Sequence, residues 1–511
     1  MFVDLTSHLF SVAYISVASS FIVFLLGAVF LLLISSRAST LPLINGRKPS
    51  EITYTHAKKR FLKDAQSLIK AGFGKASVFR IISENGLKTV LGSQYAREIR
   101  GHHALSFGAI FEKEFHANIR GFEPFRQGTT SDEIFMDAVR MQLTRSLGSV
   151  TQPLSSETAV ALEKEWSDST DWYDLCLKSS ILRIVSQISS RVFLGDKLCR
   201  DPNWLRITVA YTTDSFIAAQ ELRLWPELIR PLAAYFLPSC RKIRRTIQEA
   251  RAIIGPVLEV RRIDREAAIK SVKTPDRYVD AMQWMEDSAK GRYYDPAIAQ
   301  LTFSNAAIHT TTDMLTQVLL DLCGQEEVIQ ALRTEISTVI QEEGWRKTAL
   351  YKLKLMDSVL KESQRLKPIN IVSMRRLALE DIELSNGIVI PRGTYVVVSS
   401  DQMWDPSVYP NPEHFDPYRF LRLREIPGHE TSSLSVSPSP EHMGFGFGKH
   451  ACPGRFFAIN EVKIALCHIL MKYDFKLAEG CIPKVRRHGF ALSSDPLARI
   501  SIKRRREEIV L

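Results

Sequence analysis

One cysteine of this chain, Cys452, stands in a loop rich in glycine. The stretch reads Phe445-Gly-Phe-Gly-Lys-His-Ala-Cys-Pro-Gly454, with Gly446 and Gly448 ahead of the cysteine. Glycine adopts positive φ freely and lets the backbone approach a flat object closely. The apolar run 456–466 predicts a helix just after the loop, and a helix N-terminus favours negative charge on a nearby sulfur. A thiolate held in this way is the ligand that a haem iron needs to activate oxygen.

The spacing of this loop resembles the haem-ligand loop of the cytochrome P450 family. The resemblance rests on Phe445, Gly448, Cys452 and Gly454. It implies a haem b cofactor, with Cys452 as the metal ligand and the other three residues in the haem site. The alternative is a structural cysteine buried in a turn, which is the usual state of a lone free cysteine. The full pattern favours the haem ligand over this alternative.

A second motif pairs a carboxylate with a guanidinium. Glu362 and Arg365 lie in a predicted helix, 356–366, and share one of its faces. Alone, such a pair is usually a surface salt bridge. The proline-rich stretch 412–420 adds Arg419. Together these segments resemble the Glu-x-x-Arg helix and the meander of the cytochrome P450 family, which implies that the three side chains form a buried ionic triad bracing the haem loop.

The family resemblance implies that a long helix lies over such a haem. Asp295 and Pro296 provide a cap and first turn, and the pattern runs to about Cys323 before Gly324 ends it. The next segment, 325–342, is predicted to be helical again.

This helix carries the sequence Ala306-Ala-Ile-His-Thr-Thr311. It resembles the family's segment of two small residues, an acid and a threonine. The resemblance implies that Ala306 and Ala307 leave room beside the haem. It also implies that Thr310 guides protons, since a threonine hydroxyl can interrupt helical bonding and position water.

His309 stands where the family has its acid, so the usual carboxylate relay is missing. A histidine titrates near neutrality and could take over proton delivery. The alternative is a histidine that only forms a hydrogen bond with a neighbour, and the sequence does not separate the two.

Haem propionates need cationic or hydrogen-bond donor partners. Where the family usually has an arginine this chain has His450, preceded by Lys449. Either could serve through a hydrogen bond or a charge. Arg375 and Arg376 are further candidates, and spacing does not choose between them. The family's Trp-x-x-x-Arg helix is not visible near residues 130–150, and two arginines could replace it: Arg140 and Arg145.

The first 36 residues differ from the rest. No charged residue lies between Asp4 and Arg37, and 21–34 is unbroken apolar sequence, so the segment is long enough to span a bilayer. A signal peptide would need basic residues before its core. Positive charge follows the segment instead, which predicts a cytosolic catalytic domain. We therefore expect a membrane anchor at 1–36, a catalytic domain at 37–511, and a single-pass protein of the endoplasmic reticulum membrane.

Composition limits the remaining functions. The chain has 511 residues, a net charge of +11 and seven scattered cysteines without CxxC spacing, which fits a reducing compartment without disulfides or structural zinc. Basic clusters at 241–245 and 503–506 could meet an acidic redox protein or anionic lipid. No aromatic residues are interleaved with them, so nucleic acid is not an expected partner.

The predicted fold is mainly α, a cytochrome P450 fold with a large helical domain and small β-hairpin sheets. Residues 130–270 are predicted to form amphipathic helices. Asn-Gly turns predict hairpins at 78–91 and 382–390. The serine- and proline-rich stretch 431–440 is interpreted as a surface insertion, and the apolar stretch 225–237 as core rather than an access channel.

These features predict a membrane-anchored haem-thiolate monooxygenase that inserts one oxygen atom from O2 into an apolar small molecule. The sequence around Cys452 resembles fungal microsomal members of secondary metabolism, which implies a terpenoid or polyketide intermediate as substrate. Family membership implies electrons from an NADPH-cytochrome P450 reductase docking near Lys449 and Arg455, with cytochrome b5 as a further donor. The alternatives are a haem-thiolate isomerase or dehydratase that needs no reductase, and a non-enzymatic haem sensor.

Overall fold

The computed structural model describes residues 41–127, 133–272, 274, 277–509 and 511. The chain divides after Leu43 into two units, and the fold below is that of the second, residues 44–511. The predicted anchor at 1–36 lies outside the described residues. Within the described ranges, no helix combines the length and hydrophobicity needed to span a bilayer.

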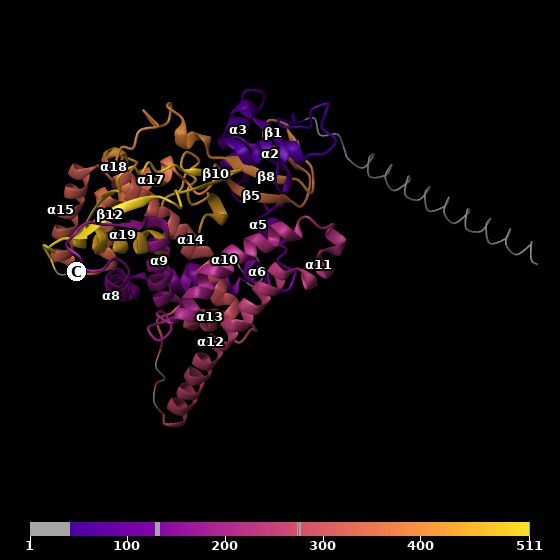
Figure 1. Ribbon diagram of the computed structural model, residues 1–511. Coiled ribbons are helices and arrows are strands. Elements are labelled where there is room, and N and C mark those ends of the chain that lie inside the picture. The colour runs from indigo at the N-terminus through magenta and orange to yellow at the C-terminus, as the bar shows by residue number, and fades with distance from the viewer. Residues whose placement is uncertain (1–40, 128–132, 273, 275–276, 510) are drawn as a thin grey trace, which may run out of the picture. The chain divides into compact units, whose positions relative to one another are not determined.

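The described fold is mainly helical, as the sequence predicts. Four helices lie side by side at its centre (Figure 1) and bury apolar side chains in one large cluster. They are α8 (Leu147–Trp166), α9 (Leu177–Leu194), α14 (Pro296–Leu322) and α19 (Arg455–Lys472).

Sequence signals set the ends of the central helix α14. The Asp295 side chain accepts from the backbone N–H groups of Ala297 and Ile298, and Pro296 occupies the first turn, where no N–H is needed. Gly324 follows with φ +80°, a conformation that glycine adopts without strain. The predicted boundaries are therefore confirmed.

The other helices flank this centre. The predicted helices at 325–342 and 356–366 are confirmed as α15 and α17, and the described part of 130–270, from residue 133 onward, is mainly helical as expected. The remaining helices are α2 (Thr55–Lys63), α3 (Ala65–Phe73), α4 (Ala96–Ile99), α5 (Phe107–Glu114), α6 (Pro124–Gln127), α7 (Ile134–Asp137), a π-helix (Ala138–Leu143), α10 (Pro202–Leu222), α11 (Arg230–Phe236), α12 (Pro238–Lys270), α13 (Ala281–Ala289), α15 (Glu326–Glu343), α16 (Lys347–Lys352), α17 (Lys354–Leu366) and α18 (Arg419–Arg424).

Small sheets complete the fold. A five-stranded sheet has the order β1-β2-β8-β5-β3, and a three-stranded sheet has the order β4-β12-β9. Both predicted hairpins form, β1 with β2 and β6 with β7. Their turn glycines, Gly86 and Gly387, have positive φ. The strands are β1 (Val78–Ser83), β2 (Gly86–Leu91), β3 (Leu105–Ser106), β4 (Tyr173–Cys176), β5 (Val372–Ala378), β6 (Ile382–Glu383), β7 (Val389–Ile390), β8 (Tyr395–Ser399), β9 (Tyr473–Leu477), β10 (Arg486–His488), β11 (Ala491–Ser493) and β12 (Arg499–Arg504).

The prediction of a surface insertion at 431–440 is wrong. Ser433 and Ser435 are buried. Asp357 of α17 accepts from the N–H and hydroxyl groups of Ser435. Lys361, one turn further along α17, donates to three carbonyl oxygens of this stretch at 2.8–2.9 Å. The stretch is polar because buried charges on α17 bind its backbone and hydroxyl groups.

The assignment of the apolar stretch 225–237 to the core is also wrong. Leu228 is 96 % exposed, and Leu232 and Phe236 are each 63 % exposed. Only Ala233 and Ala234 of the short helix α11 are buried. The large apolar side chains of this stretch therefore face outward.

Candidate active site

The cysteine loop has the conformation that its glycines permit. Gly446 and Gly448 have φ of +74° and +76°. A Cβ on Gly448 would lie 2.4 Å from the Cβ of Arg100, so this position also excludes side chains by packing. The Cys452 N–H donates to the Phe445 carbonyl at 2.8 Å, which closes the loop. Gly454 has an ordinary φ of −88° and caps α19, so positive φ is not its role.

The electrostatics of Cys452 differ from the expectation. Burial raises the pKa of the Cys452 thiol, and this effect exceeds the opposing influence of the Gly454 and Arg455 N–H groups and the Arg455 guanidinium. The helix N-terminus alone therefore does not produce a thiolate. A coordinated metal cation does so, because it deprotonates a thiol ligand outright. Arg455 also donates to the Cys452 carbonyl at 2.8 Å and thereby fixes the loop.

A cationic group lies beside the loop, around His450. The His450 ring stacks on Phe107 at 5.6 Å between centroids. Burial, with the charges of Arg376, Lys449 and Arg140, lowers the pKa of His450 to about 4. His450 is therefore a neutral hydrogen-bond donor among cations at neutral pH.

Arg376 is a buried cation without an anion. It is 3 % exposed, burial lowers its pKa to about 10, and no carboxylate of the described residues lies within salt-bridge distance. Its guanidinium donates to the carbonyl of Arg375 at 2.6 Å. An uncompensated buried charge is strongly unfavourable. The site therefore fits an anionic group, as a haem propionate would be.

Arg375 has a different environment. Its guanidinium lies 3.8 Å from Glu114 and donates to Asn370 Oδ1 at 3.0 Å. The pairing of β5 with β8 shifts between Ser373 and Arg376, and an irregularity of this kind re-aims side chains. The structure thus distinguishes the environments of two arginines that the sequence could not distinguish.

The two arginines further upstream, Arg140 and Arg145, also lie in different environments. Arg140 Nη2 donates to the Lys449 carbonyl at 3.3 Å, from a π-helical turn. Arg145 is exposed. Of the two, Arg140 is the one that reaches the cysteine loop.

The central helix presents an accessible face. Ala306 and Thr310, one turn apart on α14, are exposed although most of this helix is buried. The Thr310 hydroxyl donates to the carbonyl oxygens of Ala306 and Ala307 at 2.9 and 3.1 Å. A threonine in this geometry competes with helical backbone bonding, as expected for the segment.

His309 is directed elsewhere. Its Nε2 lies 3.3 Å from the Val209 carbonyl of α10, so Nε2 carries the proton. Burial lowers the pKa of His309, with a smaller contribution from Lys178 in the same direction. The geometry favours a histidine that joins α14 to α10 over one that delivers protons beside Thr310.

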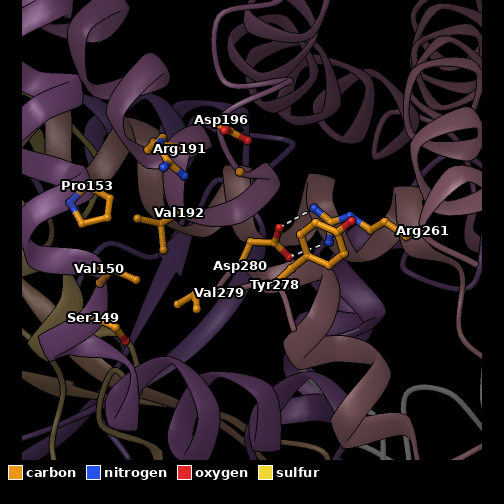
Figure 2. Close-up of a pocket in the computed structure, with 11 residues that line it drawn as sticks. Ser149, Val150, Pro153, Arg191, Val192, Asp196, Arg261, Tyr278, Val279 and Asp280 are labelled. Atoms are coloured by element: carbon orange, nitrogen blue, oxygen red, sulfur yellow. Dashed lines mark hydrogen bonds and ion pairs between the residues drawn. The ribbon is translucent and has the colours of Figure 1, made fainter. Parts of the chain in front are cut away.

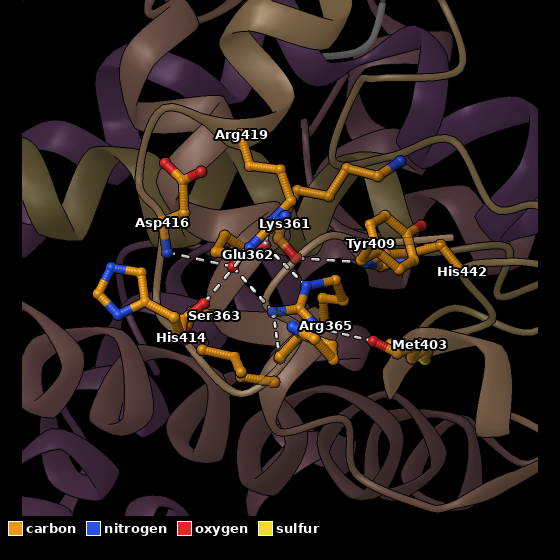
Figure 3. A network of polar contacts seen from close by, with 12 residues as sticks. Lys361, Glu362, Ser363, Arg365, Met403, Tyr409, His414, Asp416, Arg419 and His442 are labelled. Carbon is orange, nitrogen blue, oxygen red and sulfur yellow. Dashed lines mark hydrogen bonds and ion pairs between the residues drawn. The ribbon is translucent and has the colours of Figure 1, made fainter. Parts of the chain in front are cut away.

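The structure brings the three predicted ionic residues together (Figure 3). Glu362 and Arg365 are fully buried and form two hydrogen bonds of 2.8 and 2.9 Å. Arg419 Nε lies 3.1 Å from both Glu362 oxygens. Arg365 also donates to the carbonyls of Met403 and Pro412. The triad therefore ties α17 to the proline-rich stretch that precedes the cysteine loop.

A pocket distinct from these residues lies between α8, α9 and the segment before α13 (Figure 2). Its main charged groups satisfy each other: Arg261 Nη1 lies 3.0 Å from Asp280 Oδ1, and the guanidinium covers the Tyr278 ring at 3.8 Å. None of the predicted site residues lines this pocket. It is therefore not the reaction site.

Sequence reasoning missed two contributors. Phe107 lies between His450 and Arg376, within 6 Å of both. Lys361 holds the stretch before the cysteine loop. Neither contact had a local signal in the sequence, because each joins segments that lie far apart in the chain.

Fold and site together define a helical protein with a cysteine-ligand loop and an anion-binding group beside it. The chain belongs to the cytochrome P450 family, because the family model "Cytochrome P450" matches residues 134–499. It is 55 % identical to cytochrome P450 monooxygenase adrA of Penicillium rubens, over 95 % of this chain and 96 % of the relative. It is 51 % identical to cytochrome P450 monooxygenase trt6 of Aspergillus terreus, over 90 % and 94 %. The protein is thus a cytochrome P450 monooxygenase, and haem iron and a redox partner follow from the family.

Proposed function

We propose that this enzyme inserts one oxygen atom from O2 into an apolar small molecule of fungal secondary metabolism, a terpenoid or polyketide intermediate. The observation that carries the proposal is the juxtaposition of Cys452, on its glycine loop, with the unpaired cation of Arg376. Cys452 would supply a ligand for the haem iron, and Arg376 would supply a partner for an anionic group of the cofactor. Relatives from Penicillium and Aspergillus support the fungal assignment.

Each residue of the site has a part in this proposal. Cys452 is the ligand of the haem iron, which supplies oxygen activation when bound. Arg376 and His450 hold the propionates, one by charge and one as a neutral donor, with Arg140 and Lys449 adding positive potential. Ala306 and Ala307 are small enough to leave room beside a bound haem, and the Thr310 hydroxyl would position water at the accessible face of α14.

We infer electron supply from an NADPH-cytochrome P450 reductase that docks near Lys449 and Arg455, with cytochrome b5 as a second donor. The chain's net charge of +11 supports an acidic partner, since complementary charge increases association rates. We further propose that 1–36 anchors the enzyme in the endoplasmic reticulum membrane with its catalytic domain in the cytosol. The exposed apolar residues of 224–236 support a membrane-facing surface.

The absorption spectrum of the reduced CO complex tests the ligand assignment. We expect Cys452→Ser to lose the band that reports thiolate ligation, while Cys467→Ser, a buried free cysteine of α19, keeps it. Persistence of the band in Cys452→Ser would overturn the assignment.

Turnover tests the reaction class. Product formation should require both NADPH and the reductase. Product formed without them would indicate a haem-thiolate isomerase or dehydratase. Haem binding without any product would indicate a haem sensor. Product analysis after co-expression with candidate pathways then identifies the substrate.

A further inference from the structure

A buried carboxyl group, Glu461, lies on α19, which packs against α14 (Figure 1). Glu461 is 1 % exposed, and the Ser189 hydroxyl of α9 donates to its Oε1 at 2.6 Å. The other oxygen, Oε2, has no hydrogen-bond partner among the described residues. None of the roles assigned above uses this carboxyl group.

Glu461 is uncharged at neutral pH. Burial raises its pKa to about 8, and the hydroxyls of Ser189 and Thr311 lower it by less. No charged side chain contributes to this shift, and burial lowers the pKa of His309, the histidine that α14 directs toward α10. Because Oε1 accepts from Ser189, Oε2 is the oxygen available to carry the acid proton.

One face of α14 carries buried polar atoms that also lack partners. Gln300 Oε1, Ser304 Oγ and Thr311 Oγ1 have none among the described residues, and all three residues are more than nine-tenths buried. With Ala307 they occupy positions i, i+4, i+7 and i+11, which share one helix face. We call these four residues, three polar residues and one alanine, the polar stripe of α14. Ordered water normally satisfies buried groups of this kind.

The polar stripe connects Glu461 with the accessible face of α14. The Thr311 hydroxyl lies close enough to Glu461 to affect its pKa. One residue earlier, the Thr310 hydroxyl donates to the carbonyl of Ala307, a member of the stripe. The turn from Ala307 to Thr311 therefore has a buried acid on one side and an accessible hydroxyl on the other.

We propose that the Glu461 carboxyl group is the internal proton source for the Thr310–Thr311 turn, in place of the acid absent from position 309. The proposal rests on the monooxygenase function, which consumes protons at this turn. In the transfer, the O–H bond at Glu461 Oε2 breaks and a new O–H bond forms on a water of the polar stripe. That water passes a proton on to the turn, and the resulting carboxylate is protonated again by a hydronium ion from the solvent, so no oxidant or reductant is required.

The first test compares Glu461→Gln with Asp321→Asn. Asp321 is a matched control because it is a half-buried carboxyl on α14 whose pKa desolvation raises to about 6, but it binds Ser363 and Gln317 instead. We expect Glu461→Gln to lower product per NADPH several-fold, to raise hydrogen peroxide release and to increase the solvent isotope effect on product formation. Asp321→Asn should match the parent enzyme in all three.

If Glu461→Gln does not bind haem, the Thr311→Val variant takes its place in the test. Valine keeps the shape of threonine without its hydroxyl, so the same loss of product per NADPH is expected. If the deciding variant, Glu461→Gln or else Thr311→Val, forms as much product per NADPH as the parent, the proposal is overturned. The monooxygenase function still holds in that case, because the parent forms product. Absence of product from the parent with reductase and NADPH would instead contradict that function.

Two measurements do not depend on turnover. The infrared spectrum at pH 7 should contain a protonated carboxyl band that Glu461→Gln removes and D2O shifts. The pH dependence of thermal stability is the second measurement. Folding raises the pKa of Glu461 from its unfolded value of about 4.3 to about 8, so the folded state retains a proton that the unfolded state loses. The parent should therefore lose stability relative to Glu461→Gln as pH rises from 5 to 8. A pH-independent difference in Tm would show that Glu461 is ionised and would overturn the proposal.

Discussion

Arg375 and Arg376 are adjacent in strand β5, and their different surroundings give them different roles. Arg375 lies near Glu114, whereas Arg376 is buried without a carboxylate. Removing Arg376 should therefore act in opposite directions on the haem-free and haem-loaded proteins. The haem-free protein loses an unpaired buried charge and gains stability, while the loaded protein loses a propionate partner.

We accordingly expect Arg376→Met to lower haem affinity by roughly 10–100-fold, the value of one charged hydrogen bond. Transfer of haem to an excess of a competing apoprotein measures this loss. The melting temperature of the haem-free form should rise in the same variant. Arg375→Met is the matched control and should retain haem like the parent. Equal haem loss in both variants would contradict the assignment of Arg376.

Adjacent residues of α14, His309 and Thr310, should also differ. Thr310→Ala removes the accessible hydroxyl, so NADPH consumption should continue while product per NADPH falls and peroxide rises. His309→Ala removes a contact with the Val209 carbonyl on another helix. It should leave coupling unchanged and lower the melting temperature instead. If His309→Ala uncouples turnover with a changed pH profile, histidine is the proton donor after all.

At the scale of elements, the contact of α17 with the proline-rich stretch depends on buried charge. Glu362 holds two arginines, so losing either leaves a buried carboxylate with fewer partners. We expect Arg419→Ala to lower the free energy of unfolding by about 3–5 kcal/mol and to reduce haem incorporation with it. Arg422→Ala is a control on the same short helix, because Arg422, which pairs with Asp416, is itself largely exposed. That variant should lose less than about 1 kcal/mol. Urea titration of both proteins distinguishes these values.

Elements with local signals were predictable from the sequence. The ends of α14 follow from Asp295-Pro296 and Gly324, and both hairpins follow from Asn-Gly turns, because caps and turns depend on neighbouring residues. The Glu362–Arg365 pair was predictable for the same reason, since its members are one helical turn apart.

Features that depend on distant segments were not predictable. The serine-rich stretch before the cysteine loop resembles a surface loop until Lys361 and Asp357 of α17 are placed against it. Phe107 contacts His450 across more than three hundred residues of chain. The thiol of Cys452 shows the same limit, because a helix N-terminus is visible in sequence but the extent of burial is not.

At the scale of the whole molecule, one surface has the composition of a membrane contact. The stretch 224–236 exposes large apolar side chains, among them Leu228, Leu232 and Phe236, and basic residues follow it at 241–245. Apolar insertion combined with cationic contact is the usual basis of interfacial binding to anionic lipid. We therefore predict two independent membrane contacts, the anchor at 1–36 and this apolar surface.

Deleting 1–36 should convert integral association into weaker binding that high salt reduces, with the CO spectrum unchanged. In the truncated protein, replacing Leu228, Leu232 and Phe236 together by serine should abolish the remaining binding to anionic vesicles in a sedimentation assay. Serine at Ile482 and Leu497, which are exposed to a similar degree on another part of the chain, should leave that binding intact. Equal loss in both variants would mean that the contact is non-specific. Protection of the catalytic domain from protease inside sealed microsomes would contradict its cytosolic orientation, since only a lumenal domain escapes an external protease.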